Sequence, residues 1–487
     1  MINGAIAPHF REKLVEVMRN SPYSLFTDGS NNTGREKMNL LTGRMFDINT
    51  QRVESRLFDD CATAAVIFDK TDQALDTHSI PWANYVGFGV DNTSIGLRKR
   101  NSIMTRMKEN NAACYFMGCP CHLIHNVVCK SASSFKQLFV FDVDLFYYFN
   151  KSTMRKSMLV EFSEFCDVKH RQVIKHVSTH WLNLETAVQQ NLYVCPALKS
   201  YFLSNSESLP HFRVYFLFYN AVLPVFTTLN KYLQREDPCI FAAHDQIQDF
   251  VKRVLGKFIS IRNIREAKYV ENVQFEGEEN QPEDEELFFG LVINKRLPKG
   301  DIEPTQRSMF FKAVQQFYVA AITEPIAKLH LDDSVFKHSR FLDFQRDKRT
   351  FTDVESFVNT YSDLLLASPQ DREKLQEEFV DYQLLGHIDI TESIWVDVIW
   401  GHLSSLKMAD GSLKFGRISK VAKAVLVLPH SNAGEERVFS MVRRNKSSFR
   451  SSLKVDGTLA SLITIKLANK EQCYNFEPTE EVLTKAK

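Results

Sequence analysis

The 487-residue sequence lacks the segments that direct or anchor a protein to a membrane. Its first residues carry neither a basic start nor an apolar core of the signal-peptide type. The most apolar stretch, residues 214–229, contains Asn220 and Pro224 and is shorter than the roughly 20 residues that a spanning helix needs. These absences predict a soluble intracellular protein that makes no membrane contact.

Cysteine is sparse and unevenly placed. The nine cysteines are an odd number, and the first of them is Cys61. An odd count without a secretory leader indicates a reducing compartment rather than a disulfide framework. Several cysteines gather between Cys114 and Cys129, around the string CPCHLIH that begins at Cys119. A closed zinc site usually draws on two such clusters far apart in sequence, and the chain has no second one, so we do not expect structural zinc.

No charge of one sign dominates the chain. The formal net charge is only +1, with 44% apolar and 24% charged residues, which is typical of a globular protein but indicates no class of partner. The length predicts two or three domains. The 38 phenylalanines are unusually many and predict aromatic-filled cores between helices.

The first 130 residues show the pattern of an α/β sheet. Strand patterns occupy 23–27, 37–47, 52–58, 85–90 and 112–117, and helical patterns occupy 8–20, 60–75 and 95–110. The first three strands are so closely spaced that they predict an antiparallel meander, and the later strands alternate with helices. This is the order of an RNase H-like sheet, although several other α/β folds have the same coarse order.

Asp28 and Asp91 each stand where a predicted strand ends. Strand ends bring side chains from distant parts of a chain to one sheet edge. Two carboxylates that meet there repel each other unless a cation lies between them, and Mg²⁺ and Mn²⁺ prefer such oxygen ligands. The simpler interpretation is that both aspartates close turns, which aspartate often does.

Residues 421–453 predict two helices separated by Pro429. Ser431 and Asn432 are good caps for the second helix, and Glu435 follows Asn432 at the spacing of a capping box. The stripe formed by residues 438, 439 and 442 predicts a buried face, with Glu435 at its middle and Glu436 at its edge.

A basic run follows this helix at Arg443, Arg444, Lys446 and Arg450. A carboxylate against an apolar face, next to such a run, suggests an acid placed beside a polyanion. On spacing alone, an amphipathic helix with a solvated basic end is the favoured interpretation.

The string SNAGEERVFS at residues 431–440 resembles the C-terminal signature of hAT-superfamily DNA transposases. That resemblance implies an RNase H-like sheet interrupted by a large all-helical insertion, with self-association through the C-terminal region. It also implies metal-dependent DNA cleavage and strand transfer in the nucleus. Asp28, Asp91 and Glu436 then correspond to the acidic triad that holds Mg²⁺ or Mn²⁺.

Two further motifs carry the resemblance. Cys119-x-x-His122 is similar to the Cys-x-x-His element that supports the active site in the family. His180-Trp181 resembles the Arg-Trp pair at the start of the insertion, whose tryptophan stacks on a displaced base. His180 replaces the family's arginine, and histidine cannot make a bidentate phosphate contact. Under this resemblance the basic run beyond Glu436 meets DNA phosphates, which predicts salt-sensitive binding.

The domain organisation follows from these motifs. We expect a first part of the catalytic domain at 1–130 and a helical insertion at 131–390 with a solvated acidic loop at 271–286. A C-terminal dimerisation region at 391–475 and a loose tail at 476–487 complete the chain.

The sequence leaves two functions open. Few residues and no cysteine precede Asp28, so the DNA-binding zinc finger that active hAT transposases carry is not expected upstream. The chain is therefore either a transposase core or a host protein derived from one, including a non-catalytic nuclear protein that works through self-association.

Overall fold

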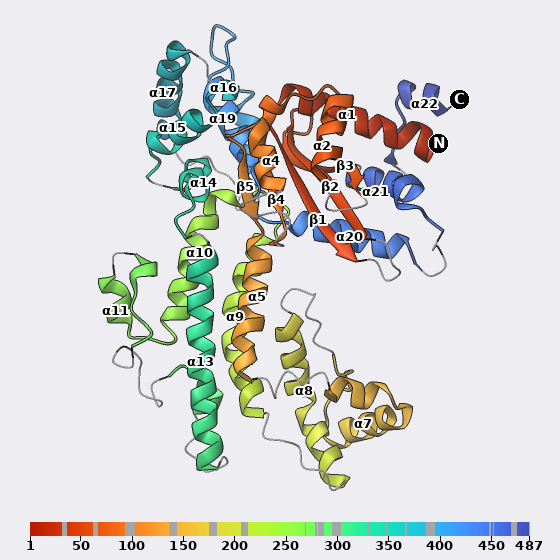
Figure 1. The fold of residues 1–487 in the computed structure, drawn as a ribbon, viewed down its shortest axis with the longest axis vertical. Coiled ribbons are helices and arrows are strands. Elements are labelled where there is room, and N and C mark those ends of the chain that lie inside the picture. The colour runs from red at the N-terminus through yellow and green to blue at the C-terminus, as the bar shows by residue number, and fades with distance from the viewer. Residues whose placement is uncertain are drawn as a thin grey trace. The chain divides into compact units, whose positions relative to one another are not determined.

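The structure is a computed structural model of the chain, shown in Figure 1. It describes residues 1–31, 37–61, 67–92, 103–135, 144–174, 183–205, 213–267, 269–277, 280, 287–294, 303–329, 331–346, 348–365, 368–385, 395–447, 450, 452–468 and 475–486. The chain divides into two compact units. Unit 1 comprises Met1–Pro120, Leu233–His244 and Asp332–Lys487, and unit 2 comprises Cys121–Tyr232 and Asp245–Leu331.

Unit 1 is built on a five-stranded mixed sheet. Its strands are β1 (Tyr23–Asn31), β2 (Lys37–Asp47), β3 (Arg52–Cys61), β4 (Tyr85–Val90) and β5 (Tyr115–Gly118). Their order across the sheet is β3-β2-β1-β4-β5, as Figure 1 shows. The first three strands pair antiparallel, whereas β4 runs parallel to both β1 and β5. This arrangement, followed by a large helical region, confirms the predicted fold class of an RNase H-like mixed sheet with a helical insertion.

Helices cover one face of the sheet and close the first core of unit 1. Helices α1 (Ala7–Asn20), α2 (Ile67–Thr77) and α4 (Ile103–Asn110) supply this layer. Leu14 and Met18 of α1 pack with Leu25 of β1, Leu41 of β2 and Phe88 of β4. Since side chains alternate along a strand, the odd positions of β1 face this core and the even positions face away from it.

The opposite face is covered by helices from the far end of the chain. Helix α20 (Ala433–Asn445) and helix α21 (Ala460–Ala468) bury Val438, Phe439 and Ile463 against Leu40 of β2 and Leu57 of β3. The apolar stripe that the sequence predicted for α20 is therefore buried, and it lies on the sheet.

A second helical layer of unit 1 leads the chain into α20. It contains α15 (Phe351–Thr360), α17 (Pro369–Leu384), α18 (Val396–Leu403) and α19 (Gly416–Leu426). Trp400 of α18 is fully buried and donates its indole N–H to the Leu342 carbonyl at 3.2 Å. Asp397, also of α18, accepts the backbone N–H of Val53 at 2.9 Å, so a side chain satisfies a donor of the edge strand β3.

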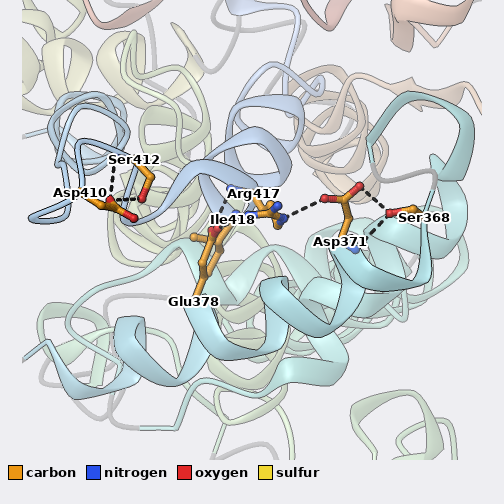
Figure 2. A network of polar contacts seen from close by, with 7 residues as sticks. All are labelled: Ser368, Asp371, Glu378, Asp410, Ser412, Arg417 and Ile418. Atoms are coloured by element: carbon orange, nitrogen blue, oxygen red, sulfur yellow. Dashed lines mark hydrogen bonds and ion pairs between the residues drawn. The ribbon is translucent and has the colours of Figure 1, made fainter.

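The start of α19 is capped by a side chain from another helix, as Figure 2 shows. Glu378 of α17 accepts the backbone N–H groups of Arg417 and Ile418 at 2.8 and 2.9 Å. The guanidinium of Arg417 also reaches Asp371, whose other oxygen accepts the Ser368 hydroxyl. A carboxylate that satisfies two free donors at a helix N-terminus stabilises that end of the helix, so α17 anchors α19.

Unit 2 is all-helical in its described part. Its main helices are α5 (Pro120–Ala132), α7 (Thr153–Phe165), α8 (Asn183–Ser204), α9 (Arg213–Leu233), α10 (Ile240–Leu255) and α13 (Pro304–Lys328). Phe218 of α9 and Phe317 of α13 lie with ring centroids 5.2 Å apart, and Phe135 and Tyr318 pack around them. The phenylalanine-rich composition thus fills the predicted aromatic core. Within the described residues, no helix is both long enough and apolar enough to span a membrane.

Some boundaries differ from those expected. Asp60 does not open a helix but pairs with Leu40 as part of β3, and α2 begins at Ile67. The acidic stretch 271–286 begins with the end of a short 3-10 helix, and within it Val273 and Phe275 are buried while Glu271, Gln274 and Glu276 are exposed. Residues 332–390, which the sequence placed in the insertion, belong to unit 1 where they are described, because α15 and α17 pack against α19.

Candidate active site

The sheet register brings Asp28 and Asp91 to neighbouring positions. Strands β1 and β4 pair in parallel, with Phe26 opposite Gly89 and Thr27 opposite Val90. Asp28 and Asp91 are the next residues of these two paired segments. Strand β1 continues to Asn31, so Asp28 lies inside its strand, whereas Asp91 directly follows the end of β4.

Asp28 belongs to the sheet face that α20 covers. In β1, Leu25 packs in the opposite core, so the side chain of Asp28 alternates onto the α20 face. In β4, Phe88 and Val90 also pack in the opposite core, which places Gly87 and Gly89 on the α20 face, and Asp91 directly follows this strand. Asp28 is buried and Asp91 is half-buried.

Two glycines of β4 allow the segment before α20 to lie directly on the sheet. A Cβ atom at Gly87 would lie 2.6 Å from Cδ of Pro429, and one at Gly89 would lie 2.9 Å from Oδ1 of Asn432. Such distances are shorter than any side chain tolerates. The pattern Gly-Phe-Gly of β4 is therefore explained by this close approach, which docks the start of α20 beside the two aspartates.

Helix α20 carries two consecutive glutamates in different surroundings. Glu436 is half-buried in the first turn, and its backbone N–H donates to the Asn432 carbonyl. Glu435 is only 1% exposed and accepts the Thr42 hydroxyl of β2 at 2.6 Å. The predicted capping box is wrong: Asn432 is the N-cap residue, but neither its side chain nor that of Glu435 caps the helix, because both bond to the sheet.

Glu435 belongs to a buried polar cluster that no sequence pattern predicted. Arg44 of β2 is buried, lies over the Phe26 ring at 4.5 Å and donates from Nη1 to Nδ1 of His430 at 3.2 Å. Burial raises the pKa of the Glu435 carboxyl, opposed by the Thr42 hydrogen bond and the Arg44 charge. Burial, with the positive charges of Arg44 and Arg437, holds the pKa of His430 far below its usual value, so this imidazole is neutral. The cluster fastens α20 to β2 across several hundred residues of sequence.

Cys119 fixes the backbone on both sides of Asp91. Its N–H donates to the Val90 carbonyl at 3.0 Å, and its carbonyl accepts the Asn92 side-chain amide at 2.6 Å. The thiol is fully buried and accepts the backbone N–H of Asn432 at 3.3 Å. Cys119 therefore lies at the sheet edge where the resemblance places a supporting cysteine.

The other residues of the predicted site are placed as follows. His122 lies half-buried in the first turn of α5, and this part of α5 belongs to unit 2. His180 and Trp181 lie outside the described residues. Further along α5, His125 Nε2 and Cys129 Sγ lie 3.5 Å apart, one helical turn from each other.

The basic run continues from the end of α20. Arg443, Arg444 and Arg450 are exposed and Lys446 is half-buried. Among the residues that the structure describes, no carboxylate forms an ion pair with any of the three arginines. Their charges are thus available to an anion in solution.

The donor set fits a divalent cation in part. Mg²⁺ is commonly held by one or two carboxylates, with water and phosphate oxygens completing its octahedron. Asp28 and Asp91 match such a pair by residue type and register. In the described part of the chain, however, no three His, Cys, Asp or Glu side chains form a group that would hold a metal. The register thus places Asp28 and Asp91 directly after two paired residues, and the described residues hold no group in which Glu436 joins them.

The signals for the missed residues were weak. Arg44 and Thr42 lie in the middle of a strand pattern, where a polar residue reads as solvent-facing, and His430 follows a proline in what the sequence presents as a linker.

No protein-family model matches the chain, and no curated protein sequence matches it.

Proposed function

We propose that the chain is the core of an hAT-like DNA transposase, or a protein derived from one, that cleaves and joins DNA strands with a divalent metal ion. The observation that carries this proposal is the parallel pairing of Thr27 with Val90, the residues directly before Asp28 and Asp91, at the part of the sheet where the segment before α20 docks. The motif SNAGEERVFS, at the junction with α20, supports the family.

Each residue has a role in this proposal. Asp28 and Asp91 hold Mg²⁺ or Mn²⁺, and Glu436 presents a further carboxylate from the first turn of α20 on the same face. When bound, such an ion polarises a phosphoryl oxygen and stabilises the charge that develops on it. The residues of the chain orient the cleavable phosphodiester and exclude part of the solvent.

The cationic surface supplies DNA affinity. Arg443, Arg444 and Arg450 are exposed and Lys446 adjoins them. Each phosphate that they neutralise releases condensed counterions, so binding weakens steeply as salt rises. Trp181, with His180, remains the proposed platform for a displaced base. A DNA substrate, nuclear localisation and self-association through the C-terminal region belong to the same proposal.

A second candidate is a non-catalytic, transposase-derived interaction protein. The absence of a three-residue metal group among the described residues favours it. This protein would self-associate but would neither bind Mn²⁺ tightly nor cut DNA.

Asp91→Asn tests the proposal. The substitution removes one ligand charge without changing side-chain size, and we expect Mn²⁺-dependent nicking of a duplex or hairpin DNA to fall by at least about 100-fold. Asp76→Asn, at an exposed position of α2, is the matched control and should nick like the parent chain. Equal nicking by the parent and by Asp91→Asn would refute the assignment, and a parent chain that cuts nothing with Mn²⁺ would favour the second candidate.

A further inference from the structure

The peptide group that precedes Asp28 is held by a residue from the opposite end of the chain. Asn432 is fully buried, and its Nδ2 donates to the Thr27 carbonyl at 3.1 Å. That carbonyl belongs to the peptide plane that joins Thr27 to Asp28. The hydrogen bond therefore orients the backbone from which the Asp28 side chain projects.

The peptide group that precedes Asp91 is held in the same way by Cys119. The Cys119 N–H donates to the Val90 carbonyl at 3.0 Å, and this carbonyl belongs to the plane that joins Val90 to Asp91. The side chain of Asn92 then bonds back to the Cys119 carbonyl. Both neighbours of Asp91 are thus tied to one residue.

The two holding residues are bonded to each other. The backbone N–H of Asn432 donates to the Cys119 thiol at 3.3 Å, and all atoms of this contact are buried. The Asn432 carbonyl accepts the N–H of Glu436 in the first turn of α20. A short chain of hydrogen bonds therefore links the backbones at Asp28 and Asp91 to the helix that carries Glu436.

From this geometry we propose that Asn432 is a positioning residue that sets the spacing of Asp28 and Asp91. It couples α20 to two strand positions, Thr27 in β1 and Val90 at the end of β4, which are called the strand ends below. As a statement about metal-dependent cleavage it rests on the function proposed above. The coupling between these strand ends and α20 is independent of the proposed function.

The site requires the chemistry of asparagine. Its amide must donate to Thr27, while its Oδ1 lies so close to Gly89 that a Cβ atom there would be 2.9 Å away. Aspartate at this position would lose the donor and add a third negative charge beside two carboxylates, which is unfavourable in a buried setting. An apolar residue would leave the Thr27 carbonyl without its side-chain donor.

Hydrogen exchange and metal titration of the full chain test the proposal. In Asn432→Ala we expect amide exchange in the segments that contain Asp28 and Asp91 to rise roughly tenfold, because a hydrogen bond to each strand end is lost or loosened. We also expect the Mn²⁺ concentration for half-maximal nicking to rise about 10–100-fold, as is usual when a residue that orients metal ligands is removed.

Asn445→Ala is the matched control. Asn445 lies at the far end of the same helix, is also buried, and donates to the Met441 carbonyl. Its removal should loosen α20 locally and leave both strand ends and the Mn²⁺ dependence unchanged. Should Asn432→Ala not fold, Asn432→Ser, which keeps a shorter donor, allows the same comparison.

The outcomes separate the two proposals. Unchanged exchange at both strand ends in the folded Asn432 variant would overturn the positioning role, whatever the activity. Loosened strand ends in a chain that neither binds Mn²⁺ nor nicks DNA would support the coupling and refute the proposed function. Loosened strand ends together with a raised Mn²⁺ requirement would support both.

Discussion

Gly89→Ala tests the claim that β4 uses glycine because α20 docks on it. An added Cβ would lie 2.5 and 2.8 Å from two carbons of the Phe26 ring and 2.9 Å from Asn432 Oδ1. Carbon atoms in contact prefer about 3.5–4.0 Å, so the ring or the strand must move by about 1 Å. Phe26 is fully buried under Arg44, which leaves the ring little room.

The expected cost is that of overpacking a core, about 1–3 kcal/mol of the free energy of unfolding of unit 1. The displaced groups are Phe26 and Asn432, and Asn432 is the N-cap residue of α20, so α20 should move as well. Mn²⁺-dependent nicking should therefore fall together with stability. Urea unfolding followed by tryptophan fluorescence and the nicking assay measure the two effects.

Gly434→Ala is the control for this experiment. Gly434 lies in the first turn of α20, and a Cβ there meets nothing within 4 Å. Alanine should be neutral or stabilise the helix by about 0.5–1 kcal/mol. A Gly89→Ala chain as stable and as active as Gly434→Ala would show that the segment before α20 does not lie on β4, and the site geometry would fall with it.

Two further predictions concern the charges of α20. Because burial raises the pKa of Glu435, the folded chain binds more protons than the unfolded chain above the ordinary glutamate pKa, so stability should fall as pH rises through the raised value. Glu435→Gln, which keeps an acceptor for Thr42, should reduce this decline above the ordinary glutamate pKa in urea unfolding, whereas Glu161→Gln at an exposed position of α7 should leave it unchanged; an identical slope in Glu435→Gln would contradict the assignment. Replacing Arg443 and Arg444 together by alanine should lower the slope of log K for duplex DNA against log salt by about 2, since each contact releases roughly 0.9 counterion; an unaltered slope would place the DNA elsewhere.

Local pattern predicted the sheet well because its signals are short-range. The strand over 85–90 has the observed bounds, and Asp91 directly follows its end as predicted. The prediction that the first strand ends at Asp28 is wrong, because β1 continues to Asn31 through its pairing with β2. The helical spacing also predicted correctly that Glu435 is more deeply buried than Glu436.

Side-chain partners far apart in sequence could not be predicted in this way. Asn432 has the residue type and spacing of a helix cap. In the fold, however, its Nδ2 donates to the Thr27 carbonyl, and its side chain does not cap α20. The partnership of Thr42 with Glu435 and of Arg44 with His430 likewise depends on tertiary structure. Local propensity carries no information about these contacts.

The discontinuity of unit 1 has a consequence for how the protein is made. Roughly 340 residues of chain separate Asp91 from the helix that covers its side of the sheet. At about 5–20 residues per second, a ribosome needs roughly 20–70 s to synthesise that interval. During this time α20 and α21 do not yet cover the sheet, so Leu40 and Leu57 lie exposed until the last helices of unit 1 have been synthesised.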